Sequence, residues 1–141
     1  MIFIIVTAIL ALDQFTKFLA SKNLFLNQSI PVISQVFHFT LIHNKGAAFG
    51  ILKERVPLFI IASTLAIILL YLNIKKHRKT SLYSISLGLI LSGALGNLID
   101  RLFLGYVIDF LDFRIWPVFN IADSAITVGA ILLGWSMIRK A

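Results

Sequence analysis

The chain alternates long apolar runs with short polar connections. Four runs, at about residues 2–20, 56–74, 82–99 and 118–138, are long enough to cross a hydrocarbon core of roughly 30 Å as helices. Hydrophobic side chains make up 59% of the chain and charged ones 13%, which is too apolar for a soluble domain of this length. We therefore predict one all-α, polytopic integral membrane domain over residues 1–141, with four transmembrane helices.

The first run predicts a retained span rather than a cleaved secretory signal. It has no basic start, and polar side chains interrupt it where a signal would have its apolar centre or cleavage site. Among them, Asp13 and Lys17 are four residues apart and share a helix face. They form either a structural ion pair or a polar contact for something bound between helices.

The connection over residues 21–55 predicts a small extracytoplasmic β-sheet and an interfacial segment. Residues 37–41 alternate apolar and polar side chains, as a strand with one apolar face does. Residues 43–52 contain two glycines that permit a bend, followed by an apolar end that can lie on the bilayer surface. His38 and His43 have no acidic neighbour in this loop before Glu54, so we expect no metal site.

The basic residues indicate membrane topology rather than binding to nucleic acid. The net charge is +7, but the thirteen lysines and arginines are scattered among loops and tails, without an aromatic-flanked basic face. By the positive-inside rule, the densest clusters place both termini in the cytoplasm and residues 21–55 and 100–117 outside. These clusters are Lys75, Lys76, Arg78 and Lys79 between the second and third runs, and Arg139 and Lys140 after the fourth.

Five of the six acidic residues are predicted to lie near one membrane face, because successive spans run in opposite directions. The end of the first span, the end of the third and the start of the fourth all reach that face, whichever way the protein is inserted. Two carboxyl groups close together near hydrocarbon would share one proton, since adjacent anions repel. The five residues are Asp13, Asp100, Asp109, Asp112 and Asp123.

Such a pair is suited to acid–base hydrolysis. One carboxylate can deprotonate water for attack on a carbonyl while the protonated partner stabilises the oxyanion or protonates the leaving amine. The sequence has no His-Glu-x-x-His motif, no Gly-x-Ser-x-Gly motif and no cysteine, which excludes disulfides and thiolate chemistry. From the residues alone, a hydrolase, a proton or cation relay and purely structural polarity all stay open.

Five motifs together resemble the lipoprotein signal peptidases, also called signal peptidase II, which are aspartyl proteases of the bacterial inner membrane. The resemblance extends along most of the chain, and the five blocks in order are far more specific than any one of them. They are Asp13-Gln14-Phe15-Thr16-Lys17, His43-Asn44-Lys45-Gly46-Ala47-Ala48-Phe49-Gly50, Gly96-Asn97-Leu98-Ile99-Asp100-Arg101, Val107-Ile108-Asp109-Phe110 and Phe119-Asn120-Ile121-Ala122-Asp123.

The resemblance implies removal of the signal peptide from a diacylglyceryl-modified prolipoprotein, by cleavage before the lipidated cysteine and without a cofactor. Asp109 and Asp123 would be catalytic, with Asp100 in support, although a pairing of Asp100 with Asp123 stays open. The residues expected to line or brace the site are Asp13, Lys17, Asn44, Gly46, Asn97, Arg101 and Asn120.

The resemblance also implies a location and partners. We expect a bacterial cytoplasmic (inner) membrane protein, monomeric, with its active site near the extracytoplasmic face. Membrane lipid and the cyclic peptide inhibitor globomycin are the expected partners besides the substrate, and nucleic acid is not. The link from Asp109 to Asp123 is shorter than is usual for the family, which leaves Asp112, Arg114 and Trp116 without assigned roles.

Overall fold

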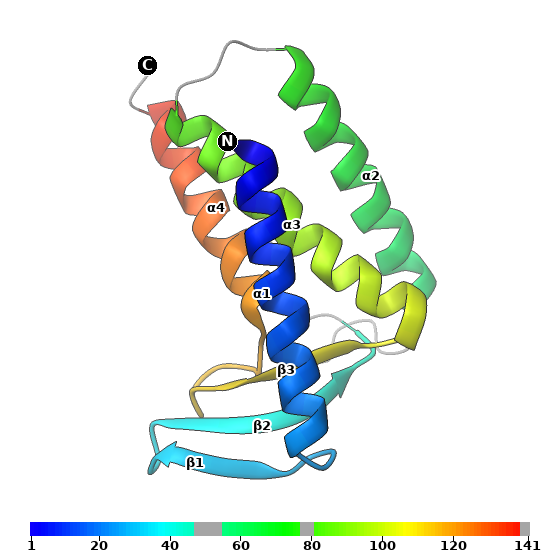
Figure 1. Ribbon diagram of the computed structural model, residues 1–141, viewed down its shortest axis with the longest axis vertical. Helices are drawn as coiled ribbons and strands as arrows, with labels where there is room; N and C mark the ends of the chain where they lie inside the picture. Colours follow the sequence, from blue (N-terminus) through cyan, green and yellow to red (C-terminus); the bar gives the residue numbers. More distant parts are fainter. Residues whose placement is uncertain (47–54, 77–80, 139–141) are drawn as a thin grey trace.

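The computed structural model describes residues 1–46, 55–76 and 81–138. Within these ranges, four helices and three strands follow one another, and their arrangement is drawn in Figure 1. Their bounds are α1 Ile2–Asn23, β1 Ser29–Ile33, β2 Phe37–Asn44, α2 Val56–Lys76, α3 Ser81–Leu104, β3 Val107–Asp112 and α4 Ile121–Ile138.

The helices fit a membrane by length and composition. In the described part of the chain, α1, α3 and α4 are each long and apolar enough to cross a bilayer, and α2 contributes a shorter apolar stretch over Val56–Leu72. The helical architecture of a membrane protein with a small sheet is therefore as predicted.

The helix bounds differ from the predicted ones at the ends of α1 and α3 and at the start of α4. Helix α1 continues to Asn23, and α3 continues to Leu104, so Asp100 and Arg101 lie on a helix instead of in the loop predicted over residues 100–117. Helix α4 begins at Ile121 rather than at residue 118, because Asn120 caps its first turn.

Helix α3 is the centre of the helical part, since it packs against α1, α2 and α4. Small residues allow this close approach. A β-carbon at Gly93 would collide with the backbone carbonyl of Ala122 on α4. A β-carbon at Gly96 would lie 2.5 Å from the Asp13 carboxylate of α1. Gly93 and Gly96 thus let α4 and α1 approach α3 closely at neighbouring positions.

The three strands form one antiparallel sheet in the order β1-β2-β3. Strand β2 includes the predicted strand over residues 37–41 and is longer than predicted. Strand β3 was not predicted, and Asp109, expected on an irregular segment, lies within it, opposite Ile42 of β2. Residues 47–52 of the predicted interfacial segment lie outside the described residues.

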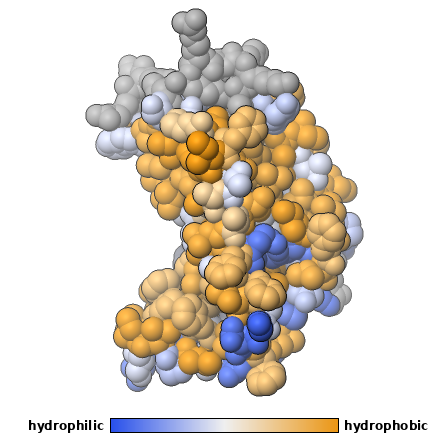
Figure 2. Space-filling view, in the orientation of Figure 1, coloured by the Kyte–Doolittle hydropathy of each residue, from blue (hydrophilic) through white to orange (hydrophobic). Residues whose placement is uncertain are grey.

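The sheet lies at one end of the helices, opposite the start of α1 and the end of α4 (Figure 1). Its core is formed by Leu41, Ile108 and Phe110 packed against Ala20 of α1. Figure 2 shows apolar side chains over most of the helical part and hydrophilic ones gathered in the half that contains the sheet. The ends of α1 and α3 and the start of α4 therefore meet beside the sheet, as the alternating direction of the spans predicts.

Candidate active site

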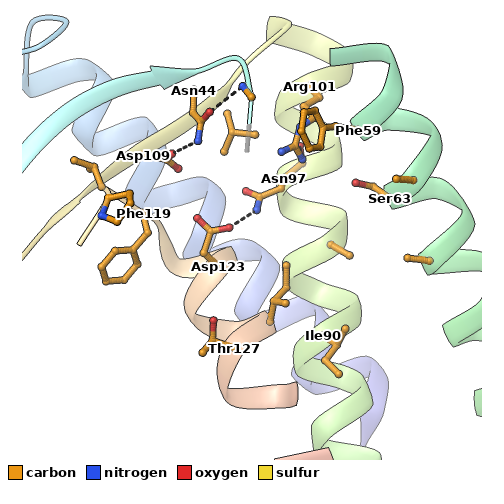
Figure 3. Close-up of a pocket in the computed structure, with 18 of the residues that line it drawn as sticks. Asn44, Phe59, Ser63, Ile90, Asn97, Arg101, Asp109, Phe119, Asp123 and Thr127 are labelled. Atoms are coloured by element: carbon orange, nitrogen blue, oxygen red, sulfur yellow. Dashed lines mark hydrogen bonds between the residues drawn. The ribbon is translucent and has the colours of Figure 1, made fainter. Parts of the chain in front are cut away.

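A cavity of about 550 Å³ lies among α2, α3, α4 and the adjoining end of β3. Figure 3 shows its polar end, where two carboxyl groups lie on the same side of the cavity. The remaining walls extend between α2, α3 and α4 and are mostly apolar, with Ser63 and Thr127 as polar members. The polar end has Asn44, Asn97, Arg101, Asp109 and Asp123, and the apolar walls include Phe59, Ala66, Leu70, Ile90 and Ile126.

Strand β3 places Asp109 in this cavity. Successive side chains of a strand point to opposite faces, and Val107 and Asp109 both line the cavity while Ile108 and Phe110 belong to the core of the sheet. The Asp109 side chain is 1% exposed. Its Oδ2 accepts a hydrogen bond from Asn44 Nδ2 at 2.9 Å, and its Oδ1 accepts one from Asn120 Nδ2 at 2.7 Å.

Burial is the main reason that the pKa of Asp109 is raised to about 7, and the negative charge of Asp123 raises it further. The amide donors of Asn44 and Asn120 and the charge of Lys17 act in the opposite direction. At neutral pH, Asp109 is therefore protonated in a large fraction of molecules.

Asp123 lies in the first turn of α4 and is fixed by two asparagines. Asn97 Nδ2 on α3 donates to Asp123 Oδ1 at 2.8 Å. The backbone N–H of Asp123 donates to Asn120 Oδ1 at 2.9 Å, and the backbone N–H of Asn120 donates to Asp123 Oδ2 at 3.4 Å. This reciprocal pattern has the form of a capping box, with Asn120 at the N-cap position and Asp123 three residues later.

Asn120 joins the two carboxyl groups. Its side chain is fully buried, and its Nδ2 donates to Asp109 Oδ1, to Asn97 Oδ1 at 3.1 Å and to the backbone oxygen of Ile108 at 3.2 Å. Since Asn97 Oδ1 accepts from Asn120, the amide of Asn97 must turn its Nδ2 toward Asp123. The start of α4 thus sets the geometry of both acids.

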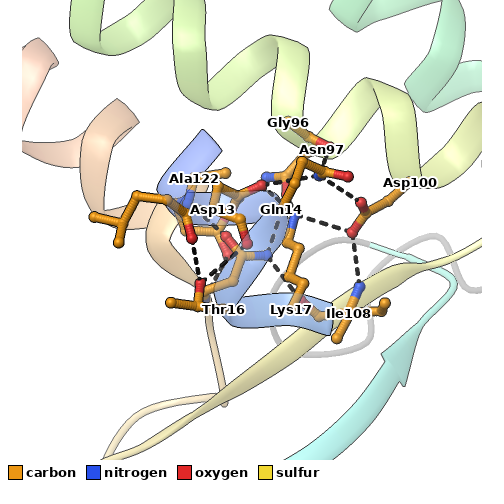
Figure 4. A network of polar contacts seen from close by, with 12 residues as sticks. Asp13, Gln14, Thr16, Lys17, Gly96, Asn97, Asp100, Ile108 and Ala122 are labelled. Carbon is orange, nitrogen blue, oxygen red and sulfur yellow. Dashed lines mark hydrogen bonds and ion pairs between the residues drawn. The ribbon is translucent and has the colours of Figure 1, made fainter. Parts of the chain in front are cut away.

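Next to Asn97, Lys17 forms a buried ion network with Asp13 and Asp100 (Figure 4). Its Nζ lies 2.8 Å from Asp13 Oδ2 and 2.9 Å from Asp100 Oδ2, and it donates to Asn97 Oδ1 at 3.1 Å. Asp13 Oδ1 also accepts the backbone N–H of Ala122 at 2.9 Å. Asp13 and Lys17 therefore form a buried ion pair, and Lys17 also contacts Asn97, which donates to Asp123.

Asp100 belongs to the ion network rather than to the wall of the cavity. Besides Lys17, its carboxylate accepts the backbone N–H of Ile108 at 3.0 Å and the Gln14 amide at 3.0 Å. Gln14 was not predicted as a site residue. It also donates to Asp13 and to the backbone oxygen of Gly96, so it links α1 to α3.

The other predicted residues lie at the mouth and wall of the cavity. The guanidinium of Arg101 lies 5.1 Å from the centre of the Phe59 ring on α2, and its Nη1 donates to the Asn97 backbone oxygen at 3.4 Å. The Gly46 N–H donates to Asn44 Oδ1 at 2.9 Å, which fixes the amide that contacts Asp109. Trp116 lines the same cavity.

Asp112 is separate from this site. Its carboxylate accepts hydrogen bonds from Thr40 Oγ1 at 2.7 Å, from the Arg114 backbone N–H at 2.8 Å and from the Arg114 guanidinium at 3.0 Å. Burial alone would raise the pKa of Asp112, but these hydrogen bonds and the Arg114 charge lower it. Asp112 therefore braces the loop that follows β3.

The arrangement can hold one proton on a buried carboxyl group beside a second carboxylate, at the polar end of an apolar cavity. That is a suitable place for acid–base chemistry on a substrate that brings both a polar bond and apolar chains. The amides around the two acids can orient them without supplying a competing acid.

Comparison with known proteins identifies the family. A family model described as Signal peptidase (SPase) II matches residues 5–139. The lipoprotein signal peptidase of Halothermothrix orenii is 50% identical over 133 residues, which cover 94% of this chain and 92% of the relative. The lipoprotein signal peptidase of Caldanaerobacter subterraneus subsp. tengcongensis is 50% identical over 141 residues, which cover 99% of this chain and 97% of the relative.

Two solved structures have the same fold as this chain. One bacterial membrane enzyme, solved at 2.3 Å resolution, matches with a TM-score of 0.91 and 34% identity, covering 98% of this chain and 87% of that one. Another bacterial membrane enzyme, solved at 1.9 Å resolution, matches with a TM-score of 0.89 and 34% identity, covering 99% of this chain and 94% of that one. The family predicted from the motifs is therefore confirmed, and the chain belongs to the signal peptidase II family.

Proposed function

We propose that this protein removes the signal peptide from diacylglyceryl-modified prolipoproteins, by cleaving the peptide bond before the lipidated cysteine. Asp109 and Asp123 activate the water that attacks this bond. The observation that carries the proposal is the placement of these two carboxyl groups, from β3 and α4, at the polar end of one cavity, joined through Asn120.

In the proposed reaction, Asp109 begins protonated and Asp123 begins as the carboxylate. The oxygen of water attacks the carbonyl carbon while its proton passes to Asp123, and the proton of Asp109 passes to the carbonyl oxygen. The C–N bond then breaks. The leaving amine takes the proton from Asp123, and a hydroxyl of the intermediate returns a proton to Asp109, which restores the starting state.

The starting state is supported by the surroundings of each acid. Burial and the charge of Asp123 favour the protonated form of Asp109 near neutral pH. Asp123 accepts the Asn97 amide and lies in the first turn of α4, where the helix dipole favours an anion. Lys17 and Asn120 both donate to Asn97 Oδ1, so they keep the Asn97 donor directed at Asp123.

The polar end and the apolar walls of the cavity fit the two parts of the proposed substrate. The scissile peptide would lie at the polar end, where Asn44 and Arg101 can hydrogen-bond backbone groups that are costly to leave unpaired in lipid. The lipid chains and the apolar part of the signal peptide would lie against the walls from α2, α3 and α4. Globomycin would occupy the same polar end as a peptide inhibitor.

We place the enzyme in the bacterial inner membrane as a monomer, with both termini in the cytoplasm. The basic residues at and directly after the end of α2, and those after α4, support this orientation under the positive-inside rule. The sheet and the acids then lie at the extracytoplasmic face, at the opposite end of the helices from these residues.

A gel-shift assay with a purified diacylglyceryl precursor in detergent tests the proposal. We expect cleavage that globomycin inhibits, no cleavage of the precursor without its lipid, and none by Asp109→Asn. Asp112→Asn is the matched control, because Asp112 is also buried on β3 but contacts Thr40 and Arg114. A folded Asp109→Asn variant that cleaves at the rate of the control contradicts the assignment.

A further inference from the structure

A second, apolar groove lies between the last turns of α1 and the sheet. Its volume is about 360 Å³, more than twice the ~150 Å³ of an apolar cavity that stays dry and binds benzene. Leu19 and Ala20 of α1 and Leu24, which directly follows α1, line one side, and Ile30, Phe39 and Phe110 line the other from the three strands.

This groove is on the opposite face of β3 from the acids. Val107 and Asp109 line the candidate active site, whereas Phe110 lines the groove, as the alternation of side chains along a strand requires. The residues that line the groove and those that line the active-site cavity do not overlap. A molecule in the groove therefore does not occupy the place of the scissile bond.

The polar side chains of the groove use their donors within α1. The Thr16 hydroxyl donates to the backbone oxygens of Leu12 and Asp13, at 2.8 and 3.0 Å. The Asn23 amide donates to the Leu19 backbone oxygen at 2.7 Å. The other residues that line the groove are all apolar, so the surface is suited to a hydrocarbon chain rather than to a peptide or a headgroup.

The groove is also at the depth of the acyl chains. At about 1.5 Å per residue, Thr16 is ~21 Å and Leu24 ~33 Å along the axis from Ile2, in a bilayer whose hydrocarbon core is roughly 30 Å thick. With Ile2 at one boundary of this core, the groove lies in the leaflet next to the sheet and reaches the opposite boundary at Leu24. Phe15 and Phe18, which neighbour Thr16 and Leu19 of the groove in the sequence of α1, are each 58% exposed.

We propose that this groove binds one acyl chain of a bilayer phospholipid, which is not the substrate. The chain packs behind β3, against Phe39 and Phe110, and supports from the rear the strand that carries Asp109. This inference does not depend on the reaction proposed for the acids.

Native mass spectrometry of the full chain, purified in a mild detergent with added phosphatidylglycerol, tests the proposal. Leu19→Trp and Ile30→Trp fill the groove from opposite walls, and both residues are partly exposed, at 40% and 43%. Excluding even two methylenes from burial weakens the binding constant by about tenfold, which lowers occupancy to a similar extent when the lipid is below saturation. We expect the unsubstituted chain to retain one phospholipid and both variants to lose it to at least this extent.

Matched controls add the same tryptophan outside the groove. Leu12→Trp is on α1 and Val32→Trp is on β1, at residues that are 47% and 53% exposed and do not line the groove. We expect both to retain the phospholipid. Retention by the two filling variants, or equal loss from the controls, overturns the proposal.

The source of the chain is tested by photocrosslinking in phosphatidylglycerol vesicles, with a diazirine on the acyl chain of either the phospholipid or the diacylglyceryl precursor. We expect the phospholipid probe to label Leu24 and Phe39 more in the unsubstituted chain than in Ile30→Trp. Labelling of Phe39 by the precursor probe instead assigns the groove to the substrate and overturns the proposal.

Discussion

Lys17→Met removes the ammonium group that lies between Asp13 and Asp100 and contacts Asn97. The Lys17 side chain is 2% exposed, and those of Asp13 and Asp100 are 0% and 3% exposed. Methionine keeps most of the apolar stem of lysine, so the variant isolates the loss of charge and of hydrogen bonds. It leaves two carboxylates buried without their cation.

The expected cost follows from these contacts. Breaking a buried ion pair on one side destabilises a protein by about 3–5 kcal/mol, because the partner charge stays uncompensated. Here both carboxylates keep other donors, since Asp13 accepts the Ala122 N–H and Asp100 accepts the Ile108 N–H. We therefore expect a loss near the lower end, about 3 kcal/mol of the free energy of unfolding.

Unfolding in mixed detergent micelles, followed by circular dichroism, measures this loss. Lys22→Met is the matched control, because Lys22 is exposed near the end of α1 and lies 5.8 Å from the centre of the Phe18 ring. We expect the control to lose less than about 1 kcal/mol. The double variant Lys17→Met with Asp100→Asn should recover part of the loss, because it removes one uncompensated charge.

The same variant tests the link to the acids. Without the Lys17 donor, Asn97 Oδ1 keeps only its bond from Asn120, so we expect slower cleavage at conditions where the variant is fully folded. A stability loss no larger than that of Lys22→Met, together with an unchanged cleavage rate, would refute the role given to the ion network.

Two further predictions concern pH and helix packing. The pKa of Asp109 rises from 3.8 to about 7 because of burial and the charge of Asp123, so the folded protein binds this proton more tightly than the unfolded chain. This stabilisation is complete below pH 3.8 and is lost as the pH rises through about 7. The unfolding midpoint of Asp109→Asn should therefore depend less steeply on pH over this range. An unchanged slope would contradict the raised pKa of Asp109. Gly93→Ala pushes against the Ala122 carbonyl and should cost about 1–3 kcal/mol of unfolding free energy. Gly134→Ala on α4 meets no atom within 4 Å and should be neutral or stabilising by up to about 1 kcal/mol; equal effects of the two would argue against close α3–α4 packing.

The meeting of the acids beside one end of the helices could be predicted from the sequence because it depends on span length and alternating direction alone. Asp100 near the end of one helix and Asp123 near the start of the next must reach the same face when the spans alternate. Apolar length is a robust signal in membrane proteins, since the backbone must satisfy its hydrogen bonds internally. That reasoning needed no side-chain contact.

Strands β1 and β3 were harder to predict for different reasons. Nearly every residue of β3 is buried, because one face of the strand lines the candidate active-site cavity and the other packs in the core beneath the sheet. Apolar and polar side chains therefore do not alternate cleanly along it. Strand β1 contains Pro31, which weakens a strand pattern, and it is tolerated because β1 is the edge of the sheet.

The partners of the polar side chains could not be predicted from spacing. Gln14 contacts Asp100 across 86 positions of sequence, and Asp13 contacts the Ala122 N–H across 109. Neither pair has a local periodic signal. Asn120 was expected to brace the site, but only the folded chain shows that its amide contacts Asp109 and that its carbonyl caps the turn that holds Asp123.

The central claim is that Asp109 and Asp123 act as one unit. The most direct test is the single-turnover cleavage rate of Asp109→Asn, Asp123→Asn and the double variant, each shown to be folded. We predict that each single substitution lowers the rate by about 10²–10⁴-fold and that the double variant is no slower than the slower single one. Independent, multiplying losses, or a folded Asp123→Asn variant that stays active while Asp100→Asn does not, would contradict the account.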